Sequence, residues 1–351
     1  MTVLGQIRAV LLGEYCSTVA IITNYTSYLI TYWLVFIVMW KQGSISISEW
    51  RYVWSKGGEW RMLMVCGFLD TCANLSMYIS QPHLPVIVLS IMAQSNLYWV
   101  AGWSFTFFRR RYTAIECMGV ILSFCASMTV AYTACTSDAS LYEKNGLAHI
   151  QPQYLLLLIF SCGCLTLSIT LKQRSFRNYL LHQQSLMGDS PRGARFSRVA
   201  SQRLNPFVVS SCCNTFGFCF MIPALFTIHG DSALQLFEDG FAFVFSNHDG
   251  VGFYLGAYTV VNLVSAIVVY QIIGWGQPLF VFIGNKLTVP ATAVLVACFA
   301  FPVLGLQPFP PVQMAALVIE ICGAALWFIG QRWRDENPDS NVCCYPFFKS
   351  N

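Results

Sequence analysis

The sequence predicts an all-α polytopic membrane protein made of two inverted five-helix repeats, with the first helix of the first repeat missing. Three observations predict this fold: a very apolar composition, about nine apolar segments of spanning length, and a spacing of polar residues that recurs along the chain. Of the 351 residues, 56% are hydrophobic and 10% are charged, and the mean hydropathy is +0.56. Soluble domains carry about 25% charged residues, so this chain has too few charges for a water-exposed surface.

Apolar segments of about 20 residues, the length that crosses a bilayer as a helix, predict about nine spans. The expected spans are 17–40, 60–81, 84–107, 113–134, 153–171, 207–228, 251–272, 277–302 and 312–332. The stretch QPHLP, from Gln81 to Pro85, divides one long apolar run, because two prolines this close favour a turn.

The charges of the connecting loops predict the orientation of the spans. Basic residues gather in 41–60, in Arg109–Arg111, in the loop 172–204 and at the start of the tail 333–351. The loops between them carry mostly acidic residues, so the positive-inside rule places the basic loops and the C-terminus in the cytosol. The acidic segment 232–246 is too short and too charged to cross, and is either an amphipathic helix on the lumenal surface or an ordinary loop.

A recurring spacing of polar residues indicates an internal repeat. Asp70 and Gln94 are 24 positions apart, as are Asn262 and Lys286, and a shift of 192 residues relates the two pairs. The predicted organisation is a first repeat at 1–134 and a second at 135–332. An odd number of helices in each repeat inverts the second relative to the first, as in many alternating-access carriers. Either an N-terminal segment is missing from the sequence, which we favour, or the protein has nine spans.

Charged residues inside spans are the main candidates for function, because a charge at the bilayer centre costs about 2.5–3.5 kcal/mol. Asp70 lies in the middle of its span and Lys286 about ten residues into its own, so we expect Asp70 to titrate in a cavity and Lys286 to bind an anion or pair with Asp70. Glu116, close to the arginine cluster, is predicted to form an interfacial ion pair. For Glu320 we expect helix packing or dimerisation rather than transport.

Neutral polar residues extend the predicted substrate and proton cavity. The set comprises Asn74, Gln94, Ser95, Asn96, Asn262 and Ser265. Polar residues of this kind also hold helices together without binding a solute, and that alternative stays open. No histidine, metal-ligand or nucleophile pattern lies inside the spans, so we expect no enzyme activity, no cofactor, no metal and no nucleic-acid partner. The expected partners are a small-molecule substrate, protons and the bilayer, with a homodimer left open.

The order of several short motifs resembles the chloroquine-resistance-transporter-like family of the drug/metabolite transporter superfamily. Leu69-Asp70, Gln94, Arg109–Tyr112 and Gly119 resemble its third to fifth helices. Further similar positions follow in order: Asn205-Pro206, Pro223, Asp239–Ala242, Asn262-Leu263 and Pro290. Two departures are the absence of cysteine from 229–250 and the charge of Lys286, which is more similar to the nucleotide-sugar and sugar-phosphate branches.

The resemblance implies a ten-helix carrier in an acidic vacuolar or endolysosomal membrane. Such a carrier would move amino acids, peptides, thiols or cationic drugs to the cytosol with protons, and Asp70 would line its central cavity. The alternatives are a nucleotide-sugar or sugar-phosphate antiporter and a receptor or scaffold that transports nothing. In the tail, Tyr345 and Phe348 fit a tyrosine-based sorting signal for the same compartments.

Overall fold

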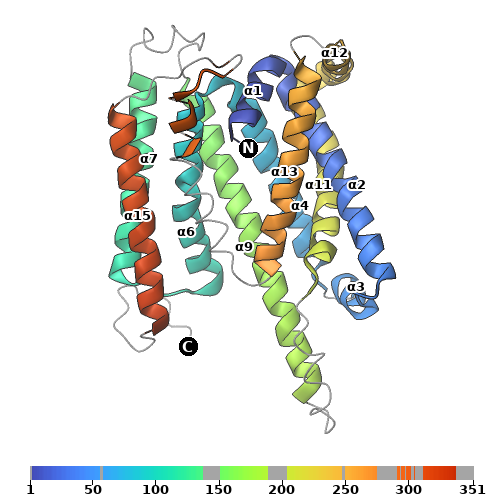
Figure 1. Ribbon diagram of the computed structural model, residues 1–351. Coiled ribbons are helices and arrows are strands. Elements are labelled where there is room, and N and C mark those ends of the chain that lie inside the picture. Colours follow the sequence, from blue (N-terminus) through green and yellow to red (C-terminus); the bar gives the residue numbers. More distant parts are fainter. Residues whose placement is uncertain are drawn as a thin grey trace. The chain divides into compact units, whose positions relative to one another are not determined.

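A computed structural model of the chain describes residues 2–55, 58–136, 151–188, 204–246, 250–274, short stretches between 291 and 304, and 311–336. In this part of the chain the regular elements are helices (Figure 1). Eight helical stretches are long and apolar enough to cross a membrane. The prediction of an all-α polytopic membrane protein is therefore confirmed.

Eight of the expected spans coincide with these stretches. The stretches are Thr2–Lys41, Trp60–His83, Val86–Phe108, Ala114–Cys135, Pro152–Ser185, Pro206–Phe245, Val251–Val269 and Pro311–Arg334. The ninth expected span, 277–302, falls largely outside the described residues, and Lys286 and Pro290 fall outside with it. The predicted count of nine therefore stays a prediction.

The helix that was expected to end at residue 171 is much longer. Helix α9 runs from Pro152 to Gly188, so the first half of the predicted loop 172–204 is helical. Residues 172–187 contain neither glycine nor proline, and the charged side chains that suggested a loop are also good helix formers. The expectation of a loop that begins at Lys172 is therefore wrong.

A short helix precedes the first expected span. Helix α1, Thr2–Leu12, leads through a 3₁₀ turn at Gly13–Tyr15 and a π-helical turn at Cys16–Ala20 into α2, Ile21–Lys41. The search for apolar segments of 20 residues missed α1 because its 11 residues are too few to cross a bilayer.

Two other local predictions can be compared with the structure. The QPHLP stretch does break the helix, since α4 spans Trp60–Ser80, a 3₁₀ turn follows at Gln81–His83, and α5 begins at Val86. The segment 232–246 is helical, as α12, Ala233–Phe245, rather than an ordinary loop. Leu234 and Phe245 near its two ends are 61% and 82% exposed, and its position on a membrane surface stays a prediction.

The chain forms two compact units, each built from segments far apart in sequence. Unit 1 comprises Met1–Gly13, Ser76–Thr166 and Phe282–Asn351, and unit 2 comprises Glu14–Leu75 and Leu167–Val281. Both units take segments from each of the two predicted repeats. We describe each unit by itself.

In unit 2 the most extensive helix packing is between α2 and α11, Pro206–His229. Hydrogen bonds at both ends show that these helices are antiparallel. Beyond the end of α2, the carboxylate of Glu49 accepts a hydrogen bond from the backbone N–H of Asn205 (2.8 Å), at the start of α11. Before the start of α2, the Ser17 hydroxyl is hydrogen-bonded to His229 (3.1 Å), the last residue of α11. Helix α13, Val251–Gly274, packs on both (Figure 1).

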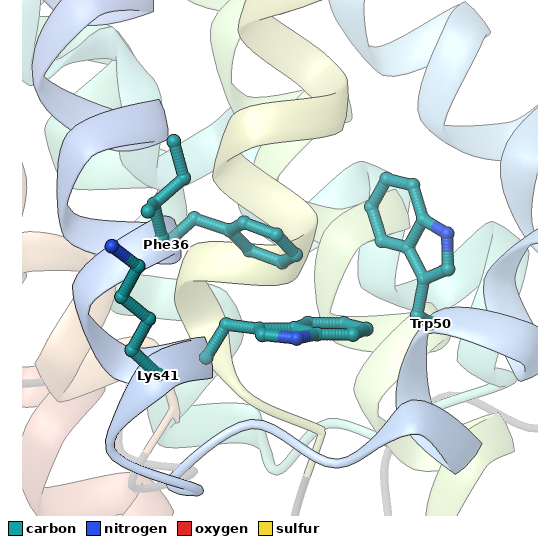
Figure 2. Close-up of a pocket in the computed structure, with 5 residues that line it drawn as sticks. Phe36, Lys41 and Trp50 are labelled. Carbon is teal, nitrogen blue, oxygen red and sulfur yellow. The ribbon is translucent and has the colours of Figure 1, made fainter.

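A groove lies where α2 meets the short helix α3, Ile47–Trp54. Its volume is about 260 Å³ (Figure 2), and its walls are formed by Phe36, Ile37, Trp40, Lys41 and Trp50. We call it the α2–α3 groove. The capping box of Ser46 and Glu49 fixes the start of α3, because each residue bonds to the backbone N–H of the other.

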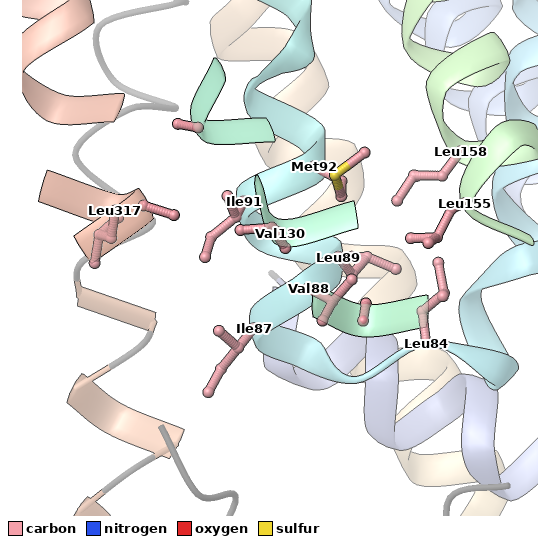
Figure 3. Packing of buried hydrophobic residues seen from close by; sticks show 13 residues of the cluster. Leu84, Ile87, Val88, Leu89, Ile91, Met92, Val130, Leu155, Leu158 and Leu317 are labelled. Carbon is pink, nitrogen blue, oxygen red and sulfur yellow. The ribbon is translucent and has the colours of Figure 1, made fainter. Parts of the chain in front are cut away.

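In unit 1 the most extensive packing is between α7, Ala114–Thr136, and α15, Pro311–Glu336. The main apolar core of this unit joins α5, Val86–Met92, to α7, α9 and α15 (Figure 3). Its fully buried members include Val88, Ile91, Met92, Ala126 and Val130. Helix α5 is buried on all sides, which explains why all its residues except Ser90 are apolar.

Candidate functional site

Asp70 lies in the middle of α4, with ten residues of helix on each side of it. At 1.5 Å of rise per residue, about 15 Å of helix separates the carboxylate from either end. A charged side chain of this length cannot reach water past either helix end by extending along the helix. The placement that the sequence predicted for Asp70 is therefore correct, and the charge needs a partner inside the protein.

The partner is Lys172 of α9. Its Nζ lies 2.7 Å from Oδ2 of Asp70, and the two side chains are 4% and 16% exposed, respectively. The desolvation penalty of each ion is large, and a close, hydrogen-bonded counter-ion offsets much of it. The pair is neutral as a whole, so it can stay in an apolar environment in a way that neither charge could alone.

The partner predicted for Asp70 from the sequence is Lys286, which lies outside the described residues. Lys172 is predicted there as a loop residue. The signal that could have found Lys172 is the sequence TLSITLK, since the lysine directly follows an apolar run without any helix-breaking residue. One turn earlier on each helix, Cys66 and Ser168 hydrogen-bond to each other's carbonyl oxygen, which fixes the two helices side by side.

Glycines let α4 approach α11 closely next to the ion pair. A Cβ atom on Gly67 would lie 2.7 Å from the carbonyl oxygen of Cys213, and one on Gly217 would lie 2.7 Å from the Tyr25 ring. Both distances are too short for any side chain. The close approach allows the hydroxyl of Thr71 to lie 3.0 Å from the carbonyl oxygens of both Gly67 and Gly217.

A hydrogen-bonded network of neutral groups continues from this contact. The Tyr25 hydroxyl donates to Thr71 (3.2 Å), and the Asn74 amide donates to the Tyr25 hydroxyl (3.2 Å) and to the backbone carbonyl of Asp70 (2.9 Å). Asn74, predicted as a cavity residue, therefore lies beside Asp70. The network orients groups from α2, α4 and α11 around the ion pair, and sequence reasoning missed its members Tyr25 and Thr71.

The other predicted site residues of unit 2 lie on α13. Asn262 is buried and Ser265 is half-buried. Helix α13 packs on α2 and α11, which brings both residues into the unit that holds Asp70. The predicted sorting residues Tyr345 and Phe348, like Lys286, lie outside the described residues.

Gln94, Ser95 and Asn96 belong to unit 1, where they interrupt a helix. A 3₁₀ turn at Ala93–Ser95 separates α5 from α6, Asn96–Phe108. Within the part of the chain that the structure describes, the buried Oγ of Ser95, Oδ1 of Asn96 and Nε1 of Trp99 have no hydrogen-bond partner. Buried polar groups are nearly always satisfied, so this helix break is suited to a polar solute or water.

A second group of charges in unit 1 surrounds Glu116, which is fully buried. Its carboxylate pairs with Arg334 (2.7 Å) and Arg110 (3.4 Å) and accepts a hydrogen bond from the backbone N–H of Thr113 (2.8 Å). The ion pair predicted for Glu116 is confirmed, and its position at the membrane interface stays a prediction. Burial, together with the like charge of Arg334, lowers the pKa of the Arg110 guanidinium from its ordinary value.

Two further buried polar side chains have packing contacts in unit 1. Glu320 of α15 accepts a short hydrogen bond from Ser123 of α7 (2.6 Å), which agrees with its expected packing role. Arg8 of α1 was overlooked in the sequence because it precedes the first expected span. It is fully buried, stacks over Tyr78 at 4.7 Å and donates to the side chain of Gln81 (3.1 Å).

The remaining observations concern possible metal ligands and the similarity of the chain to known proteins. Among the residues that the structure describes, no group of three or more His, Cys, Asp or Glu side chains is placed to hold a metal ion. No protein-family model matches the chain, and a search of curated proteins returns no match.

Proposed function

We propose that the protein is an alternating-access carrier that moves small organic solutes from an acidic vacuolar or endolysosomal lumen to the cytosol, coupled to protons. The observation that carries the proposal is the Asp70–Lys172 pair, a neutral pair of charges in the interior of two apolar helices. Ionisable residues inside spans usually mark ion or substrate pathways.

The packing of the helices supports the inverted repeat that such a carrier requires. A shift of 192 residues carries 14–75 onto 206–267, and both ranges belong to unit 2. The same shift carries 76–134 onto 268–326. The first of these ranges belongs to unit 1, and so does the second from residue 282 onward. Each unit thus combines equivalent segments of the two predicted repeats.

The antiparallel direction of the packed helices is the second observation that supports the inverted repeat. The shift relates α2 to α11 and α7 to α15, which are the two most extensive helix pairs. In each pair the start of one helix is bonded to the end of the other. Glu116 near the start of α7, for example, pairs with Arg334 near the end of α15. Equivalent helices of opposite direction are what an inverted repeat produces.

The chemistry of the pair suggests how a proton and a solute are coupled. Protonation of Asp70 removes the negative charge that holds the Lys172 ammonium, and a solute carboxylate can then take the place of Asp70. Loss of the proton restores the Asp70–Lys172 pair and releases the solute. Amino acids and short peptides supply such a carboxylate, and each state keeps the buried ammonium next to one anion.

Reconstitution in liposomes with an imposed pH gradient tests the proposal. The substrates to screen are amino acids, short peptides, a thiol, a cationic drug and a nucleotide sugar. We expect gradient-driven uptake of a carboxylate-bearing solute that Asp70→Asn reduces to background, because the variant cannot bind or release a proton. Glu320→Gln, which changes a buried carboxyl in unit 1, is the matched control and should transport normally.

Two outcomes would contradict the proposed coupling. If Asp70→Asn still concentrates solute along the pH gradient, Asp70 is not the proton site. Exchange of a phosphate-bearing solute that needs Lys172 but no gradient would instead favour the nucleotide-sugar or sugar-phosphate antiporter, for which a buried lysine is the supporting observation. A folded protein that moves none of these solutes would favour a receptor or scaffold.

A further inference from the structure

The α2–α3 groove is a preformed hollow with aromatic walls. Phe36 lies 5.4 Å from Trp50 and 5.6 Å from Trp40, measured between ring centroids. Figure 2 shows Phe36 and Trp50 as neighbouring side chains, with Lys41 on the other side of Phe36. Trp33 and Trp54 also contact Trp50, with centroid distances of 6.2 and 5.6 Å. These ring contacts hold the aromatic side chains in place, so the groove does not depend on a ligand for its shape.

The helix that forms one wall is fixed at its start. The capping box satisfies both backbone N–H groups at Ser46 and Glu49, and the second carboxylate oxygen of Glu49 accepts from the backbone of Asn205. Glu49 is 3% exposed. The acidic group nearest to the groove is therefore committed to internal bonds, which leaves the positive charge of Lys41 to set the electrostatic character of the entrance.

The charges at this end of unit 2 are predominantly positive. Lys41 and Arg51 are exposed, and so are Arg61 at the start of α4 and Arg174 on α9. Glu59, the other acidic residue here, accepts hydrogen bonds from Tyr52 (3.2 Å) and Asn178 (3.0 Å). The positive-inside rule predicts that this end faces the cytosol, where anionic lipids produce a negative surface potential.

The groove also lies at the end of a predicted span, where we expect lipid headgroups to meet acyl chains. Lys41 is the last residue of α2, one turn after Ile37, which is 45% exposed. Ile47 and Trp54 of α3 are exposed apolar residues as well. A tryptophan and lysine belt at the end of a spanning helix is typical of the membrane interface. The lining is apolar except for Lys41, so a suitable occupant has an apolar body and one anionic group.

We propose that the α2–α3 groove binds one acyl chain of an anionic phospholipid, whose phosphate pairs with Lys41. The aromatic rings contact the chain, and the ammonium selects the anionic headgroup at the membrane surface. This site is independent of the proposed transport function, because it involves neither Asp70 nor Lys172.

Quenching of tryptophan fluorescence by brominated lipids tests the proposal in the full-length protein, because Trp40 and Trp50 line the groove. The protein is reconstituted in nanodiscs that contain phosphatidylcholine and phosphatidylserine, with bromine on the acyl chains of one lipid at a time. We expect brominated phosphatidylserine to compete for the quenching site about fivefold better than brominated phosphatidylcholine, the preference that one cation at an anionic surface produces.

Three variants and one control locate the signal. Lys41→Gln should abolish the preference for phosphatidylserine, whereas the matched control Arg174→Gln, which removes an exposed cation outside the groove, should keep it. Ile37→Trp should fill the groove and abolish the preference with Lys41 intact. The double variant Trp40→Phe/Trp50→Phe retains aromatic walls but should lose the lipid-specific part of the quenching.

The proposal is overturned if the two lipids quench equally in the wild-type protein, or if Lys41→Gln leaves the preference unchanged. Stronger quenching by a brominated sterol than by either phospholipid would also overturn it, because the occupant would then be a neutral lipid.

Discussion

Two buried charge clusters, one in each unit, stabilise carboxylates in different ways. Glu116 of unit 1 has no exposed surface, and two arginines, a backbone N–H and the Thr113 hydroxyl bond to its carboxylate. Asp70 of unit 2 is in the middle of a helix, and among the described residues its carboxylate accepts one hydrogen bond, from Lys172. Glu116 joins helix ends, whereas Asp70 lies far from both ends of α4.

The difference fits a structural role for the Glu116 cluster and the switching that we propose for the Asp70–Lys172 pair. Protonation of Glu116 would leave two guanidinium groups close together without an anion, which is strongly unfavourable. Protonation of Asp70 would leave a single ammonium, which a solute carboxylate can satisfy. The local chain supports the structural role of Glu116: Arg109 ends α6 in the left-handed region with φ of 49°, and this turn brings Arg110 onto Glu116.

The largest effect on stability is expected from Glu116→Gln. The substitution removes a fully buried anion that pairs with two partly exposed arginines, a change that costs about 3–5 kcal/mol in the free energy of unfolding. Titration with a denaturing detergent measures that free energy in purified protein. The matched control is Glu14→Gln, which neutralises an exposed glutamate and should change little. Equal losses in the two variants would show that Glu116 does not stabilise the α7–α15 contact.

A somewhat smaller loss is expected from Gly119→Ala, which tests the packing beneath the Glu116 cluster. The new Cβ would lie 2.5 Å from the carbonyl oxygen of Gly323 on α15, and backbone atoms cannot yield as a flexible side chain can. Overpacking of this kind costs about 1–3 kcal/mol. Gly102→Ala is the control, because its Cβ would meet open space. A stable Gly119→Ala protein would mean that α7 and α15 are not in close contact.

Lys172→Met should destabilise the protein less than Glu116→Gln does, by about 1–3 kcal/mol at neutral pH, because it leaves one buried carboxylate without its partner. Titration with a denaturing detergent measures the loss. The double variant Asp70→Asn/Lys172→Met should recover most of the stability, because it leaves neither charge without its partner. A double variant that is no more stable than Lys172→Met would argue against a stabilising interaction between Asp70 and Lys172.

The smallest effect is expected from Ser46→Ala at the start of α3, about 1 kcal/mol, since this is the typical cost of losing an N-cap side chain. Thr113 and Glu116 form the same type of capping box at the start of α7. Thermal unfolding followed by tryptophan fluorescence suits this variant, because Trp50 and Trp54 lie on α3. Ser44→Ala, on the preceding exposed turn, is the control. An unchanged transition would mean that Glu49 alone anchors α3 to α11.

Much of the fold could be predicted because bilayer physics acts on local sequence. Apolar length located eight stretches, five of them within a few residues at both ends, and QPHLP correctly marked the break before α5. Helix α1 and the extension of α9 were missed because apolar length says nothing about a short helix or about a helix that continues into water. For the same reason Lys172 was assigned to a loop, since a charged residue at the end of an apolar run is typical of the start of a loop.

Two carboxylates of the candidate sites could be predicted from the sequence, but their distant partners could not. Asp70 stood out because a carboxylate in the middle of an apolar run needs an explanation, and Glu116 because arginines are close to it in sequence. The partner of Asp70 is 102 residues away, and Arg334 is 218 residues from Glu116. No local pattern connects such positions.

The sequence by itself determined that this is an all-α membrane protein, where most of its helices begin and end, and which charge lies in the middle of a span. These properties follow from the cost of exposing apolar groups to water and polar groups to lipid, and both costs can be read residue by residue. Only the tertiary structure decided that Lys172 neutralises Asp70 and that Tyr25, Thr71 and Asn74 surround the pair. Ion pairing depends on distances of a few ångströms between different helices, here α4 and α9, which the Cys66–Ser168 hydrogen bonds hold side by side.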